Sequence, residues 1–251
     1  MGLYNTKAIV LRSIKLAEND KLVTFLTEDF GKIKCAAKGA RSIKSKFGAA
    51  LESMSFIQLI YFGKENQSIY RLNHCDILES FQSIRDDFEK VYTAVYFNEL
   101  VDALSAEGDR TAKLFHFLLE TFYTLKDQAE LETLCPLFEM RIMALSGYMP
   151  QLDHCVLCKT VPAGKWVDFS YKKSGVACIN CCSQTKPNIR IRAGTLNYLK
   201  KLLSIDVRQT QRLKIPKSLE REIESLTHKM VSQYVVRELK SYPFIRKMTV
   251  T

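Results

Sequence analysis

The stretch Lys21-Leu-Val-Thr-Phe-Leu-Thr27, the turn Asp29-Phe-Gly31 and the stretch Lys32-Ile-Lys-Cys-Ala-Ala37 decide the first part of the fold. In the first stretch, Val23 and Phe25 alternate with their neighbours at a period of two, which is typical of a β-strand. Gly31 lets the chain reverse, and the second stretch then predicts a neighbouring strand.

Further β-rich runs lie on both sides of this pair, at residues 6–16, 54–62 and 68–78. Five short strands separated by turn signals, with no long helix between them, are typical of a small closed barrel. We therefore predict a five-stranded OB-fold barrel over residues 1–80.

From Ser83 the hydrophobic period changes from 2 to 3.6 residues, which indicates amphipathic helices. Three such stripes are expected at residues 88–104, 114–125 and 131–145, so residues 81–150 should form a helical bundle. Helical periodicity returns at residues 195–203 and 219–240, and Tyr242-Pro243 is expected to end the last run. We assign residues 187–251 to C-terminal helices that pack with the bundle, which makes the chain an α+β multidomain protein.

The charge of the chain is unevenly distributed. The 251 residues carry a net charge of +10, with +4 on residues 1–80, −6 on 81–150, +2 on 151–181 and +10 on 182–251. Basic segments of this kind favour contact with a polyanion, although charge alone also fits a basic protein with no nucleic-acid role. No apolar stretch approaches the roughly 20 residues that a membrane span needs, and the N-terminus lacks a signal sequence, so we expect a cytoplasmic protein.

Two Cys-x-x-Cys pairs lie at Cys155-Val-Leu-Cys158 and Cys178-Ile-Asn-Cys181. Each pair can hold one edge of a tetrahedron, so together they predict one structural zinc ion in a finger spanning residues 151–186. Four thiolates leave no open position for water, which argues against a catalytic metal. A redox dithiol is the alternative, but it needs only one such pair. Cys182 follows Cys181 directly, and the spacing favours Cys181 as the ligand.

Basic side chains accumulate between Asp29 and Glu52, where there is no acidic residue. On a small barrel these residues would form a strand and a positive loop suited to a phosphate backbone, although a solvated loop is the simpler alternative. The candidate DNA-binding residues are Lys32, Lys34, Lys38, Arg41, Lys44 and Lys46. A second, less secure candidate set is Arg190, Arg192, Lys200, Lys201, Arg208, Arg212 and Lys214.

Several blocks of the N-terminal segment resemble the signature of the RecO family of bacterial DNA repair proteins. These are Ala8-Ile-Val-Leu-Arg12, Glu18-Asn-Asp-Lys-Leu-Val-Thr-Phe-Leu-Thr-Glu-Asp-Phe-Gly-Lys32, and Ala37-Lys-Gly-Ala-Arg41 followed by Lys44-Ser45. The later order of helices, double Cys-x-x-Cys and C-terminal helices is similar to that family over essentially the full length.

The resemblance implies an N-terminal OB-fold and a helical region with an inserted zinc finger, with Cys155, Cys158, Cys178 and Cys181 at the zinc positions. It also implies binding of single- and double-stranded DNA and annealing of complementary strands. The implied partners are RecR, sometimes RecF, and the acidic tail of single-strand DNA-binding protein, with which such a protein helps load RecA. DNA binding would then place the chain at the nucleoid.

No phosphate loop, nucleophile elbow or paired catalytic carboxylates stand out, so we expect a protein that is not an enzyme. Two other interpretations stay open at this point. One is a zinc-stabilised protein-interaction adaptor with incidental DNA contact. The other is a zinc-dependent nucleic-acid enzyme, which would need an open coordination position at the metal.

Overall fold

A computed structural model describes residues 2–65, 67–109, 112–128, 130–186 and 188–248. The chain forms two compact units: the first combines Met1–Gln128 with Arg237–Thr251, and the second is Ala129–Val236. Residues 1, 187 and 249–251, which bound the predicted N- and C-terminal segments, lie outside the described residues. The predicted division into four segments stays a prediction.

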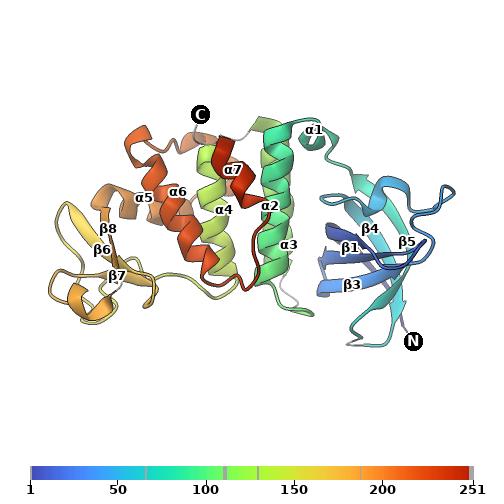
Figure 1. Ribbon diagram of the computed structural model, residues 1–251, viewed down its shortest axis with the longest axis horizontal. Helices are drawn as coiled ribbons and strands as arrows, with labels where there is room; N and C mark the ends of the chain where they lie inside the picture. The colour runs from blue at the N-terminus through green and yellow to red at the C-terminus, as the bar shows by residue number, and fades with distance from the viewer. Residues whose placement is uncertain (1, 66, 110–111, 129, 187, 249–251) are drawn as a thin grey trace. The chain divides into compact units, whose positions relative to one another are not determined.

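The first unit contains the five-stranded barrel that the alternation predicts. Its strands are β1 (Gly2–Lys15), β2 (Lys21–Thr27), β3 (Gly31–Ala37), β4 (Phe56–Gly63) and β5 (Tyr70–Glu79), with the short 3-10 helix η1 (Gly48–Leu51) before β4. They close in the order β1-β2-β3-β5-β4, with β1 antiparallel to both β2 and β4 and β3 parallel to β5 (Figure 1). This closure confirms the predicted barrel.

The barrel interior is apolar. Val10, Val23, Phe25, Ile57 and Leu59 are fully buried there, since alternate residues of each strand point inward. The β1–β2 register shifts between Val10 and Arg12, which is the sign of a β-bulge in β1.

Gly31 begins β3 in the left-handed region, at φ +65°, and a Cβ there would lie 2.0 Å from the carbonyl oxygen of Asp109. Gly31→Ala is expected to lower the free energy of unfolding by more than the roughly 1–3 kcal/mol of backbone strain alone. Gly39→Ala is the matched control, because Gly39 has φ +68° but no atom within 4 Å of its Cβ position. Urea unfolding measures the free energy of unfolding of both variants. Equal losses of stability would show that the Asp109 backbone moves away and that the close contact adds no cost.

The helices of the first unit are α1 (Gln82–Arg85), α2 (Phe88–Leu104), α3 (Ala112–Gln128) and α7 (Tyr242–Met248). Asp87 caps α2, since its carboxylate accepts from the N–H groups of Glu89 and Lys90. The Asn98 side chain of α2 donates to the carbonyl of Val10 at 3.2 Å, which fixes this helix against β1.

The second unit contains α4 (Leu131–Leu145), α5 (Ala193–Ser204) and α6 (Lys217–Ser232), with the 3-10 helices η2 (Cys182–Thr185) and η3 (Val207–Arg212). Its sheet has the order β7 (Gly175–Ala177), β6 (Trp166–Ser170), β8 (Asn188–Arg192). Strands β6 and β7 form a hairpin inside the segment predicted to be a finger, whereas β8 was missed and its residues were assigned to the C-terminal helical segment.

The expected helix over residues 219–240 is wrong in its second half. Helix α6 ends at Ser232, and the segment that follows does not continue its buried face, since Val236 is fully exposed. Residues 237–240 include good helix formers, so intrinsic propensity does not set this end; without an apolar face packed against the unit, propensity alone does not sustain a helix. Pro243 does not end a run. It lies in the first turn of α7, where its missing N–H has no helical partner to lose. Among the described residues, no helix is long and apolar enough to cross a membrane.

Candidate nucleic-acid interface and metal centre

The loop over residues 38–46, called the basic loop below, is attached to the β1–β2 turn. The N–H of Gly39 donates to the Asp20 carboxylate at 2.8 Å, and the N–H of Arg41 donates to the Asn19 carbonyl at 3.0 Å. The Arg41 guanidinium also donates to the Glu18 carbonyl at 2.6 Å. Two of the three sequence blocks that resemble the RecO signature, Glu18–Lys32 and Ala37–Arg41, therefore contact each other and attach the basic loop to the barrel.

Four cations of the basic loop keep their charge available. Lys38 and Lys44 are exposed, and the Lys46 amine donates to the Asn73 carbonyl at 2.6 Å while lying 5.2 Å from the centre of the Phe47 ring. Among the described residues, none of Lys38, Arg41, Lys44 and Lys46 forms an ion pair with a carboxylate. Their uncompensated charge favours a polyanion at this surface.

Lys32 and Lys34, on β3, differ from the basic loop. The Lys32 side chain is only 9% exposed, and its amine donates to the backbone carbonyl of Asp102 at 2.6 Å and lies 3.5 Å from the Asp102 carboxylate. Lys34 pairs with Glu107. Burial of Lys32 conflicts with its predicted direct contact to DNA, because the amine is already bound inside the protein. We therefore leave Lys32 out of the interface.

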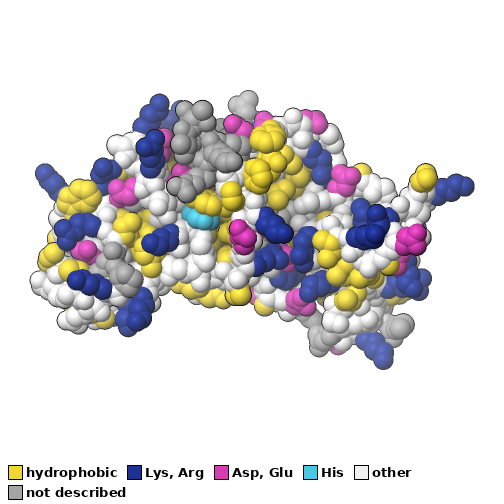
Figure 2. All heavy atoms as spheres, viewed as in Figure 1, with side chains coloured by type: hydrophobic (Ala, Val, Ile, Leu, Met, Phe, Trp, Pro, Cys, Tyr) yellow, Lys and Arg dark blue, Asp and Glu magenta, His cyan; other side chains and the backbone are white. Residues whose placement is uncertain are grey.

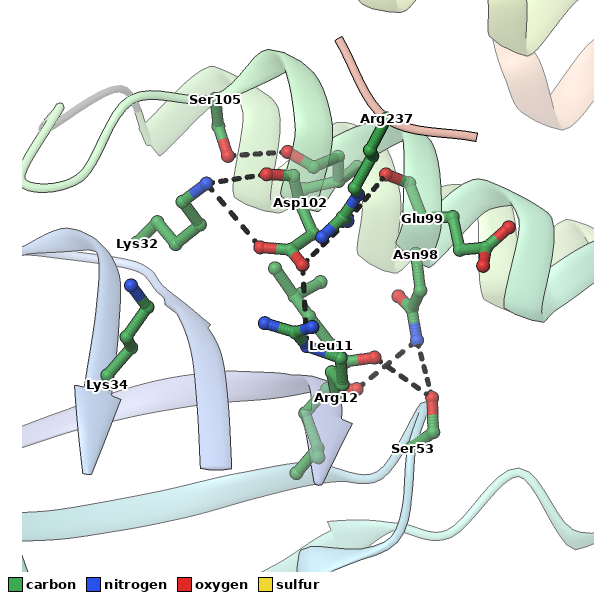
Figure 3. Close-up of polar contacts among 12 residues, drawn as sticks. Leu11, Arg12, Lys32, Lys34, Ser53, Asn98, Glu99, Asp102, Ser105 and Arg237 are labelled. Carbon is green, nitrogen blue, oxygen red and sulfur yellow. Dashed lines mark hydrogen bonds and ion pairs between the residues drawn. The ribbon is translucent and has the colours of Figure 1, made fainter. Parts of the chain in front are cut away.

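Asp102 lies at the centre of a cation cluster that the sequence analysis missed (Figure 3). The Arg237 guanidinium donates to its carboxylate at 2.7 Å, and the Arg12 guanidinium lies 3.6 Å away. Burial opposes the charged form, but the hydrogen bond from Arg237 and the charges of Arg237, Lys32 and Arg12 outweigh it, so the Asp102 pKa lies below its usual value. Burial lowers the pKa of Lys32 despite the nearby carboxylate.

An aromatic-lined cavity of about 300 Å³ lies on the barrel. Tyr4 stacks on Tyr61 with ring centres 5.0 Å apart, and Phe30 and Tyr70 meet these rings edge to face. Lys34 and Glu107 also line this cavity. Aromatic rings beside cationic groups are the side chains that bind unpaired bases and phosphates.

Most cations of the second candidate set are already paired within the second unit. Five of the seven lie within 4 Å of a carboxylate: Arg190 of Asp168, Arg192 of Glu222, Lys200 of Asp153, Arg208 of Asp206 and Lys214 of Glu130. Lys201 lies over the Tyr198 ring and Arg212 is exposed. Figure 2 shows Lys and Arg side chains dispersed over the visible face among neutral, apolar and acidic ones. The structure therefore does not gather this set into one patch.

The four predicted cysteines Cys155, Cys158, Cys178 and Cys181 come together, with all sulfur atoms within 4.8 Å of one another. The edge of a tetrahedron of thiolates around zinc is about 3.8 Å, and the Cys158 and Cys178 sulfurs lie 3.5 Å apart. The group could therefore hold a metal ion with little movement. Cys182 lies outside it, with its sulfur 3.2 Å from the Ile179 carbonyl.

The thiols of this group differ in acidity. The Thr160 hydroxyl, 3.0 Å from the sulfur, lowers the pKa of Cys158 to about 6. Contacts with the Cys178 and Cys158 sulfurs raise the pKa of Cys181 to about 12. Four adjacent thiolates repel one another, and a bound cation would remove that repulsion. The donor set therefore fits a thiophilic metal.

Two family models match the chain. The one described as Recombination protein O N terminal matches residues 1–81, and the one described as Recombination protein O C terminal matches residues 85–243. A DNA repair protein RecO from Alkaliphilus metalliredigens is 33% identical over 96% of both chains. Proteins of the same name from Thermoanaerobacter sp. and Symbiobacterium thermophilum are 30% and 31% identical, and cover 99% and 98% of this chain and 99% and 97% of their own. The chain therefore belongs to the RecO family of DNA repair proteins.

Proposed function

We propose that this protein is a non-catalytic mediator that binds single- and double-stranded DNA and anneals complementary strands. The observation that carries the proposal is the basic loop, whose four cations have no carboxylate partner among the described residues and whose backbone is fixed to the β1–β2 turn. Annealing is slowed by repulsion between phosphates, and a surface of fixed positive charge lowers that barrier. No covalent step is needed.

The aromatic-lined cavity supports binding of single strands in particular. Stacking on an aromatic ring does not depend on base identity, because every base has a π-face. The rings of Tyr4, Phe30 and Tyr70 are only partly buried, and Lys34 lies beside them. Unpaired bases at the barrel and phosphates at the basic loop would together bind a strand without sequence preference.

We further propose that Cys155, Cys158, Cys178 and Cys181 hold one structural zinc ion. All four ligand positions would be sulfur, which leaves no site for water or substrate. The metal would then stabilise the fold of the finger and take no part in a reaction. Spectroscopy that finds an oxygen ligand on the bound metal would contradict this role.

We also propose that this protein has the partners that its family membership implies. Together with RecR, in some cases with RecF, and by contact with the acidic tail of single-strand DNA-binding protein, it would help load RecA onto coated single strands. This work would take place in the cytoplasm, at the nucleoid.

Removing the charge of the basic loop tests the DNA-binding proposal. The variant with Lys38, Arg41, Lys44 and Lys46 all changed to Ala is expected to bind every DNA sequence about tenfold or more weakly at low salt, and the slope of log affinity against log salt should fall by about 0.7–0.9 for each lost contact. Gel shifts over a salt series and annealing of complementary oligonucleotides measure both effects.

The matched control removes the same charge from the same unit outside the basic loop. It changes four exposed lysines to Ala: Lys7, Lys64, Lys113 and Lys240. If the control loses as much affinity as the loop variant, net charge rather than the loop binds DNA. A wild-type protein that neither shifts DNA nor accelerates annealing would favour the adaptor interpretation.

A further inference from the structure

The sheet of β7, β6 and β8 has one buried face and one that is accessible in part, where Trp166 and Arg190 are exposed while Ser170 and Ala177 are buried. Val167, Phe169 and Ile191 alternate onto the buried face and are at most 3% exposed. Trp166 and Arg192 are paired across β6 and β8 and lie on the other face, as do Asp168 and Arg190. This accessible side is called the outer face below.

Trp166 is the only tryptophan of the chain and is 52% exposed. A single exposed aromatic side chain would be ordinary, but Trp166 lines one cavity together with the exposed Val161 and Ile179, and a contiguous apolar patch is typical of an interaction site. The Arg192 guanidinium lies 5.8 Å from the centre of the ring. It is held there because it donates to the Ser218 carbonyl and pairs with Glu222 at 3.4 Å, both on α6. The ring is thus supported from within the protein and still accessible.

A cavity of about 480 Å³ adjoins the ring on the outer face. Its lining combines apolar groups, two cations and one acid, and includes Val161, Ile179, Lys165, Arg190 and Asp168; the proposed metal ligand Cys178 also borders it. Val161 and Ile179 are 75% and 71% exposed. The volume is in the range of ligand sites of small-molecule size, large enough for a nucleotide.

The charge of this region favours an anionic ligand. Residues 151–192 carry seven Lys and Arg against two Asp. The Arg190 guanidinium lies 3.6 Å from Asp168, while its side chain stays 57% exposed. Lys165 has no ion pair among the described residues. A nucleic-acid strand matches this combination better than a purely acidic peptide, because every nucleotide offers both a phosphate for the cations and a flat base that can stack on Trp166.

We propose that the outer face is a second single-strand-binding surface, in which an unpaired base stacks on Trp166 and the adjoining phosphates contact Lys165 and Arg190. The inference rests on the proposed DNA binding and extends it from the first unit to the second. Annealing needs two strands on one protein, and a stacking surface on each unit would supply both. Binding at this surface would depend on stacking and on phosphate charge, and would not depend on the base sequence of the strand.

The sole tryptophan makes the test direct. Adding an oligothymidylate of about 16 nucleotides to the full-length, metal-loaded protein should quench Trp166 emission. In the basic-loop variant, which lacks the cations of the first surface, Trp166→Leu should weaken binding of that oligonucleotide about 5- to 150-fold, the loss expected for one base–aromatic stack. Trp166→Phe keeps a π-face and should retain most of the affinity. Circular dichroism and metal content matching the wild type show that each variant is folded.

Each outcome separates the two proposals. If the wild-type protein fails to bind DNA, both proposals fall. If it binds with unchanged Trp166 emission, and Trp166→Leu binds normally, only the second surface is overturned. A polyglutamate peptide that quenches Trp166 while the oligonucleotide does not would show that the outer face docks an acidic protein segment. If the Leu and Phe variants bind the oligonucleotide equally well, the contact at residue 166 is apolar and does not depend on stacking. That result would also overturn the proposal.

Discussion

Removing the metal should unfold the finger while the barrel stays folded. Zinc binding contributes about 10–16 kcal/mol in zinc-finger peptides, and this free energy is folding free energy because the site does not exist in the unfolded chain. The finger has only short strands and a small core, so little else would hold Cys155 and Cys158 against Cys178 and Cys181. Chelation, or Cys158→Ser, should therefore release the ion and shift Trp166 emission toward that of a solvated indole.

Cys182→Ser is the matched control, since this thiol is the neighbour of a ligand position and lies outside the four-sulfur group. It should keep one metal ion per chain by elemental analysis and leave Trp166 emission unchanged. DNA binding at the basic loop should survive chelation, because the loop belongs to the other unit. A finger that keeps its emission and protease resistance without metal would contradict the proposed role of zinc.

Asp102→Asn is expected to destabilise the first unit by about 3–5 kcal/mol, the usual cost of removing one partner from a buried ion pair. The Asp102 side chain is 7% exposed, and three cations surround its carboxylate. Without that charge Lys32 would stay buried beside Arg237 with no compensation, although its bond to the backbone carbonyl of residue 102 could persist. Urea unfolding followed by far-UV circular dichroism measures the loss.

The pH dependence has a definite sign. The folded-state pKa of Asp102 is below its unfolded value of about 4, so its contribution to stability is complete above that value and disappears as the pH falls through the folded pKa. The Asn variant should lack this component of acid sensitivity. Asp76→Asn is the control, because this carboxylate is 67% exposed and, within the part of the chain that the structure describes, has His74 as its sole ion-pair partner; it should change stability by less than about 1 kcal/mol. If the two substitutions changed stability equally, the cation cluster around Asp102 would not stabilise the first unit as predicted.

The sequence predicted local patterns well and side-chain environments poorly. The strand alternation of 21–37 predicted the barrel, and the paired spacing of the cysteines predicted which four sulfurs meet. Strand β8 was missed because its five residues precede a helix directly and carry two arginines, which read as a basic tail. A strand that pairs with a distant hairpin is stabilised by its partner rather than by its own pattern.

The environment of Lys32 illustrates the limit at the candidate site. The local sequence does not show that Lys32 is buried whereas Lys34 and Lys38 are more exposed. The residue that binds the Lys32 amine, Asp102, lies 70 positions further along the chain, in α2. The bulge in β1 likewise shifts the inward–outward alternation of side chains at Arg12. The alternation of the sequence therefore could not predict that Arg12 lies beside Asp102. The charge run pointed to a loop whose cations form no ion pair among the described residues, whereas tertiary contacts bury Lys32 and pair Lys34 with Glu107.

The return of Arg237 to Asp102 has a consequence for how the nascent chain matures. The two residues are 135 positions apart, and the whole second unit is made between them. At 5–20 residues per second, a ribosome needs on the order of ten seconds to deliver the guanidinium to the waiting carboxylate. A chain that stops before Arg237 would therefore lack one partner of a buried ion pair in the first unit, although every residue of the second unit would have been made.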